Sequence, residues 1–116
     1  MRENKLADLS MLFAVNALNL ANSVEGHYSL KYQFERSATS IGANIREANY
    51  AQSKADFLSK LSLALKEADK TQYWLELLVE SEIINQSQVE SLNIDLKEII
   101  ALLTASIKTT KNNINK

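Results

Sequence analysis

A stripe of apolar residues in the segment 34–48 places the strongest constraint on the fold. Its members recur every three or four positions, and they are Phe34, Ala38, Ile41, Ile45 and Ala48. This spacing keeps side chains on one face of an α-helix. A second row of small and polar residues lies about 100° round the same helix, and it consists of Ser37, Ser40, Asn44 and Glu47. The segment therefore predicts a helix with an apolar core face and a small, polar edge.

Gly42 lies in the middle of this helix, where glycine costs roughly 1 kcal/mol relative to alanine. A close approach of a neighbouring helix would compensate for that cost. We therefore expect Gly42, with the nearby Ser40 and Ala43, to lie where two helices pack. Asn44 and Glu47 continue the edge of this helix, and we expect them to take part in the same packing.

Composition extends the helical prediction to the whole chain of 116 residues, which has no proline and two glycines. Apolar periodicity predicts helices over residues 3–24, 28–49, 54–82 and 88–110 in one domain, with a disordered tail at 111–116. Gly26 is expected to cap the first helix, and Ser53 and Ser87 are expected to cap the third and fourth. Long helices with short connections predict an all-α, up-down-up-down antiparallel four-helix bundle.

Few residues in this chain could carry catalysis. There is no cysteine, and the one histidine, His27, has no Glu three positions before it, so the Glu-x-x-His pair of di-metal bundles is missing. No glycine-rich phosphate loop occurs either. We expect no enzyme activity, no cofactor and no metal. The alternative is an enzyme or metal-binding bundle that uses the core-edge carboxylates Glu47 and Glu67, although we expect these two to form structural ion pairs.

Charge and hydropathy limit the classes of partner that the protein is expected to bind. Thirteen basic and fourteen acidic residues give no overall attraction to nucleic acid or anionic lipid. No apolar run reaches transmembrane length and the first residues lack a signal-peptide pattern, so we expect a cytoplasmic protein with no membrane contact. The candidates for nucleic-acid contact are the basic residues expected at a corner of the second and third helices: Arg36, Arg46, Lys54 and Lys60.

Two rows of apolar residues lie where a bundle core cannot use them. Met11, Val15 and Leu18 lie more than 90° from the core stripe of the first helix, and Leu63, Trp74 and Leu77 lie nearly opposite the stripe of the third. We expect both rows on the outer wall of the bundle. Aligned exposed apolar residues mark interfaces, so the pattern predicts a homo-oligomer.

The segment 33–48, QFERSATSIGANIREA, with SKADF at 53–57, ALKEA at 64–68 and YWLELL at 73–78, resembles the 23S rRNA intervening-sequence protein family. The resemblance covers nearly the whole chain and implies a small bacterial four-helix bundle that assembles as a barrel-like homopentamer. It also implies kinship with the accessory protein of diversity-generating retroelements, whose pentamer binds a reverse transcriptase and nucleic acid. We therefore expect a non-catalytic scaffold associated with RNA, with a ribonucleoprotein or with a nucleic-acid-processing protein.

Overall fold

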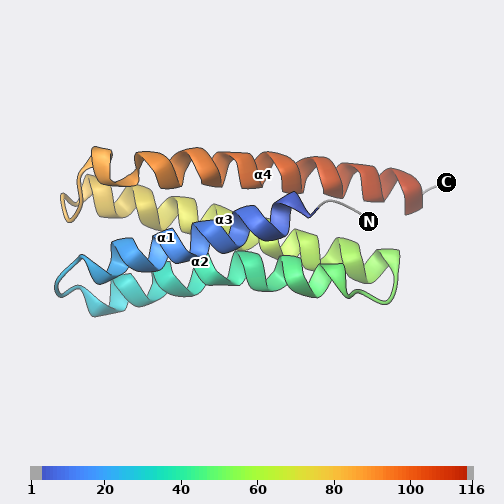
Figure 1. Ribbon diagram of the computed structural model, residues 1–116, viewed down its shortest axis with the longest axis horizontal. Helices are drawn as coiled ribbons and strands as arrows, with labels where there is room; N and C mark the ends of the chain where they lie inside the picture. Colours follow the sequence, from blue (N-terminus) through green and yellow to red (C-terminus); the bar gives the residue numbers. More distant parts are fainter. Residues whose placement is uncertain (1–3, 115–116) are drawn as a thin grey trace.

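The computed structural model describes residues 4–114, which form four helices: α1 (Lys5–Asn22), α2 (Tyr28–Asn49), α3 (Lys54–Glu80) and α4 (Gln86–Ile114). They run antiparallel in a body of 50 × 24 × 21 Å (Figure 1). Each helix packs against the next one in the chain, and α4 packs back against α1. The pairs α1 and α3, and α2 and α4, lie diagonally across the bundle. This arrangement confirms the predicted up-down-up-down four-helix bundle.

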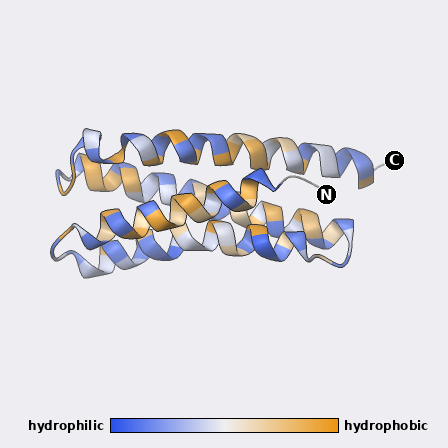
Figure 2. Cartoon of the chain, viewed as in Figure 1, coloured by the Kyte–Doolittle hydropathy of each residue, from blue (hydrophilic) through white to orange (hydrophobic). Residues whose placement is uncertain are grey.

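The core forms where the apolar stripes of the four helices meet, and Figure 2 shows apolar residues recurring between polar ones along each helix. The predicted stripe of α2 is buried from Phe34 to Ala48. On α3 the buried line runs from Leu61 to Leu78 and includes one polar residue, Thr71. Two hydroxyl residues, Ser10 of α1 and Ser37 of α2, are also buried in the core.

Several predicted helix ends are wrong, and among them α3 ends at Glu80 rather than at residue 82. α1 ends at Asn22 with Ser23 as its C-cap, so Gly26 lies in the turn after the helix, where its φ of +73° favours glycine. α4 begins at Gln86, because the side chain of Asn85 accepts a hydrogen bond from the backbone N–H of Gln88 at 3.1 Å. Asn85 takes the capping role predicted for Ser87. The Ser53 cap of α3 is confirmed, since its Oγ accepts from the Asp56 N–H at 3.0 Å.

The C-terminal end of α4 also differs from the prediction. Residues 111–114, predicted as a disordered tail, continue α4 as helix. The predicted helical residue 3 and the tail residues 115–116 lie outside the described residues.

The connection between α3 and α4 contains a Schellman motif. The N–H of Ile83 bonds to the carbonyl of Leu78 at 3.0 Å, and the N–H of Glu82 bonds to the carbonyl of Val79 at 2.9 Å. Glu82 is therefore in the left-handed conformation, with φ of +60°, at the position that glycine most often occupies. The motif satisfies two carbonyls at the end of α3 and turns the chain so that Ile84 enters the core.

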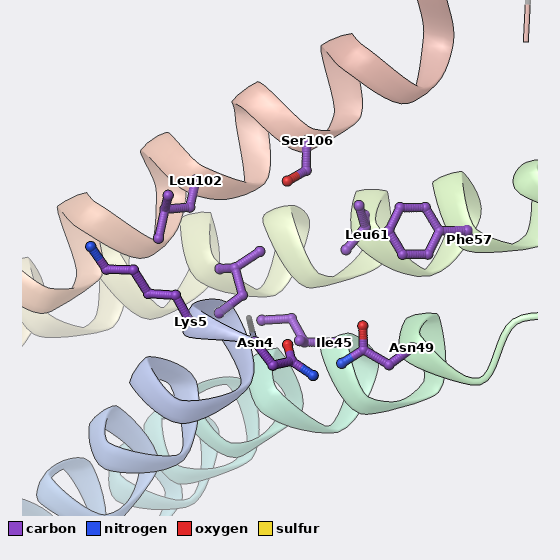
Figure 3. Close-up of a pocket in the computed structure, with 9 residues that line it drawn as sticks. Asn4, Lys5, Ile45, Asn49, Phe57, Leu61, Leu102 and Ser106 are labelled. Atoms are coloured by element: carbon purple, nitrogen blue, oxygen red, sulfur yellow. The ribbon is translucent and has the colours of Figure 1, made fainter. Parts of the chain in front are cut away.

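α1 has 18 residues and α4 has 29, so α1 covers only part of the bundle's length. Beyond the start of α1, the core is bounded by α2, α3 and α4 (Figure 1). A hollow of about 210 Å³ opens there between the first residues of α1 and the other three helices. Figure 3 shows Ile45 and Asn49 of α2, Phe57 and Leu61 of α3, and Leu102 and Ser106 of α4 around it.

Candidate interaction surface

α1 approaches α2 closely at Gly42. A Cβ added to this glycine would lie 3.3 Å from Oγ and 3.7 Å from the carbonyl oxygen of Ser10. Ser10 is buried, and its Oγ donates to the carbonyl of Ala7 at 3.2 Å. The small side chain at each position lets the two backbones approach. The close approach does not extend to Ala43, which is exposed because it lies about 100° further round α2.

The outer side of α1 carries exposed apolar residues. Met11, Val15 and Leu18 are 53, 47 and 38% exposed. Met11 also lines a groove of about 440 Å³ between α1 and α2. The walls of this groove include Ala14 of α1 and the adjacent residues Gly42 and Ala43 of α2. The structure therefore places the three residues that the periodicity singled out on one face, beside a groove.

The outer side of α3 is less apolar than predicted. Leu63 is 42% exposed, but Trp74 and Leu77 are half-buried. The expectation that Trp74 stands on an exposed wall is wrong, because its indole packs against the core at the α2 edge, beside Gln33 and Arg36. The periodicity of α3 alone does not show this, since the covering side chains come from another helix.

Polar contacts join α2 to α3 along the small, polar edge. Thr71 Oγ1 lies 3.0 Å from Ser37 Oγ, with both side chains buried. Ser40 and Asn44 bond within α2, since Ser40 Oγ donates to the carbonyl of Arg36 at 2.7 Å and Asn44 Nδ2 donates to the carbonyl of Ser40 at 2.9 Å. Ser37 and Thr71 therefore join the two helices, whereas the bonds of Ser40 and Asn44 stay within α2.

Glu47 ends this edge in an ion pair. Its Oε1 lies 2.9 Å from Nζ of Lys60 on α3. The hydrogen bond that Lys60 donates to Glu47, together with the negative charge of Glu47, raises the pKa of Lys60 above the ordinary value. Glu47 is thus engaged structurally, as the sequence analysis expected.

The four basic residues proposed for nucleic-acid contact do not gather at one corner. Arg36 lines a pocket between α2 and α3, and Arg46 lines the groove between α1 and α2. Lys54 lies in a hollow at the α2–α3 turn, and Lys60 pairs with Glu47. The ten residues from Arg36 to Arg46 separate these two cations by about 15 Å along α2, so Arg36 lies apart from Arg46 and from Lys60, which pairs with the neighbouring Glu47.

The pocket between α2 and α3, called the α2–α3 pocket below, combines Arg36, Glu67 and Trp74, which the sequence singled out for other roles, with Gln33, Lys70 and Tyr73, which it did not. It has a volume of about 210 Å³, and its walls include Gln33 and Arg36 of α2 with Glu67, Lys70, Tyr73 and Trp74 of α3. The rings of Tyr73 and Trp74 meet edge to face, with centroids 5.1 Å apart at 68°. Because the residues from the two helices are more than thirty positions apart in the chain, no local sequence signal joins them.

Only one of the two carboxylate oxygens of Glu67 has a partner in this pocket. Its Oε2 lies 3.6 Å from Nζ of Lys70, and its Oε1 is buried with no hydrogen-bond partner in the described structure. A buried acceptor without a partner is unfavourable, so a donor group entering the pocket would stabilise it.

Residues 4–114 also bear on metal binding and membrane insertion. Within that range, no group of three or more His, Cys, Asp or Glu side chains is placed to hold a metal ion. Within the same range, no helix combines the length and apolar character needed to cross a membrane.

Comparison with known proteins places the chain in a family and finds similar solved structures. A family model described as "23S rRNA-intervening sequence protein" matches residues 2–105. A crystal structure of a protein of unknown function from Bacteroides thetaiotaomicron, assigned to the S23 ribosomal protein family, is 50% identical. The alignment covers 89% of this chain and 98% of that one, with a TM-score of 0.83. A comparison with curated proteins gives no match.

Proposed function

Because the chain belongs to the 23S rRNA-intervening sequence protein family, we propose that it is a non-catalytic, homopentameric scaffold that associates with RNA. The observation that carries the proposal is the exposed apolar row on α1, formed by Met11, Val15 and Leu18. Single exposed apolar residues are common on monomers, whereas an aligned group beside a groove is typical of an interface. Another copy of the chain is the partner that this surface fits best.

A ring of five copies needs two different contact surfaces on each subunit. The exposed apolar row on α1 provides one of these surfaces. Leu63, 42% exposed on α3, marks the second, because α3 lies diagonally across the bundle from α1 and so faces another direction. The Ser10–Gly42 contact also sets the register of the α1 face, placing Tyr32 of α2 within about one turn of the level of Leu18. Tyr32 is exposed and extends the apolar surface.

A pair of matched variants tests the interface. Val15→Glu places a charge in the proposed contact, and burial of an unpaired charge is strongly unfavourable, so the variant should dissociate to monomers that remain helical. Ile94→Glu on the outer face of α4 is the control, since Ile94 is more exposed than Val15 and lies outside the proposed contact. Equal oligomer masses for the two variants in sedimentation velocity would show that the α1 row is not the interface.

RNA is the partner that the family description suggests, since it names an intervening sequence of 23S rRNA. The separated cations of one subunit support only weak binding, but an assembly repeats them. We expect binding that falls steeply between low and physiological salt, because bound cations release counterions from the phosphates. A variant with Arg36, Arg46, Lys54 and Lys60 all changed to Gln should bind less RNA. Binding that is independent of salt, or unchanged in that variant, contradicts this part of the proposal.

The alternative is a metal-binding or catalytic bundle that uses Glu47 and Glu67. The ion pair with Lys60 favours a structural role for Glu47. Metal analysis of the purified protein, together with a nuclease assay, separates the two functions. A stoichiometric metal or a nuclease activity that Glu67→Gln abolishes would favour the alternative.

A further inference from the structure

The α2–α3 pocket combines three kinds of side chain in one small hollow. Trp74 and Tyr73 offer aromatic surfaces at a steep angle to each other, Arg36 and Lys70 are cations, and Glu67 presents an acceptor that lacks a partner. At about 210 Å³ the pocket is smaller than the roughly 300–1,000 Å³ that drug-sized ligands occupy. It therefore fits one planar ring system.

We propose that the α2–α3 pocket binds one unpaired nucleobase of single-stranded RNA. This inference rests on the RNA association proposed above and assigns it a site. In this arrangement the base stacks on the indole of Trp74, and sequence-tolerant binding to single strands uses such aromatic stacking. Arg36 is exposed at the pocket and Lys70 is only loosely held by Glu67, so both cations can contact the phosphates on either side of the base.

The carboxylate of Glu67 adds a preference among bases. A carboxylate accepts hydrogen bonds but donates none when ionised. Cytosine, adenine and guanine carry an exocyclic amino group that can donate to it, and uracil carries none. Oε1 of Glu67 has no hydrogen-bond partner among the described residues, so an amino group that reaches this carboxylate meets an unused acceptor. The pocket should therefore prefer cytosine to uracil, two bases of the same ring size.

The chain has one tryptophan, and it lines this pocket, so its intrinsic fluorescence reports directly on the site. The experiment titrates the full-length protein with ten-nucleotide oligocytidine, oligouridine and an RNA duplex of the same charge. Fluorescence anisotropy of end-labelled RNA measures binding independently. We expect saturable quenching by oligocytidine, weaker quenching by oligouridine and none by the duplex, whose bases are paired.

Variants separate the pocket from general electrostatic binding. Trp74→Leu should weaken oligocytidine binding about five- to a hundredfold in anisotropy, the usual effect of losing one stacking residue. Tyr50→Leu, which removes an exposed aromatic at the α2–α3 turn, should have no such effect. Because Trp74 is half-buried, the exposed Arg36→Gln gives a second test that spares the core. It should reduce the slope of log affinity against log salt by about one, and Glu67→Gln should reduce the preference for cytosine.

Each outcome decides the inference. Quenching with the cytosine preference, together with loss of affinity in the Trp74 and Arg36 variants, supports the pocket. RNA binding seen in anisotropy without quenching, or equal binding of the duplex, overturns the pocket and leaves the RNA association standing. No RNA binding even at low salt overturns both. Quenching by oligocytidine that persists in Arg36→Gln and Glu67→Gln with unchanged affinity and preference also overturns the assigned site.

Discussion

Replacement of Glu82 by glycine should stabilise the protein. Glu82 occupies the left-handed position of the Schellman motif that ends α3, with φ of +60°. A non-glycine residue pays about 1–2 kcal/mol in that conformation, because its Cβ approaches the neighbouring carbonyl. Its charge is also unfavourable, since the C-terminal end of a helix carries partial negative charge and Glu80 is the last residue of α3.

The two effects can be separated with a series of variants. Glu82→Gln keeps the strained conformation and removes only the charge, so it should stabilise by about 0.3–1 kcal/mol. Glu82→Gly also removes the strain, although glycine loses about 0.4–1 kcal/mol more through the entropy of the unfolded chain. We expect glycine to exceed glutamine by about 0.5–1 kcal/mol, and Glu82→Asn to lie between them, because asparagine tolerates the left-handed conformation.

Urea unfolding followed by circular dichroism, at one protein concentration for all variants, measures the differences in the free energy of unfolding. In a chain of this length, 1 kcal/mol corresponds to about 4 °C in Tm. A glycine variant no more stable than the glutamine variant would refute the reasoning. Such a result would mean that the left-handed conformation of Glu82 carries no net strain.

Two further predictions concern the contacts between α2 and α3. Ser37→Ala and Thr71→Val each remove one partner of a buried 3.0 Å hydrogen bond, so a double-mutant cycle of unfolding free energies should give a coupling of about 0.5–1.5 kcal/mol; strictly additive effects would contradict the bond. Glu47 raises the pKa of Lys60 in the folded protein, so this pair stabilises below the ordinary pKa of 10.5 and its contribution is lost as the pH rises through the raised value. In Glu47→Gln, Tm should therefore fall less steeply as the pH rises through this range. A dependence of Tm on pH identical to that of the unaltered protein would refute the role of the Glu47–Lys60 pair.

Periodicity and composition were sufficient to predict the four helices and most of the core. Phe34, Ile41 and Ile45 lie where a 3.6-residue repeat places them, because the burial of a helix face depends mainly on local spacing. The ends of the helices were harder to predict from the sequence. Asn85 and Ser87 are both good capping residues two positions apart, and only the observed hydrogen bond selects Asn85. Glu82 in a left-handed conformation has no sequence signal, since glycine is the residue expected there.

The surfaces were predicted in part. The exposed row on α1 follows from its own periodicity, because Met11, Val15 and Leu18 stay exposed among residues 4–114. Trp74 was misplaced, since its burial depends on the long side chains of α2 beside it. The α2–α3 pocket depends on the register in which two antiparallel helices pack. That register follows from tertiary contacts such as Ser37 with Thr71, which a single sequence does not reveal.

The central claim is that the protein is a homo-oligomer built through the exposed apolar face of α1. Light scattering on a sizing column, at micromolar protein concentration, tests it most directly, because it gives a mass that does not depend on shape. Five copies of the 13.0 kDa chain predict a particle of about 65 kDa. A dimer or tetramer would contradict only the number of subunits, whereas a particle of 13.0 kDa would contradict the claim itself.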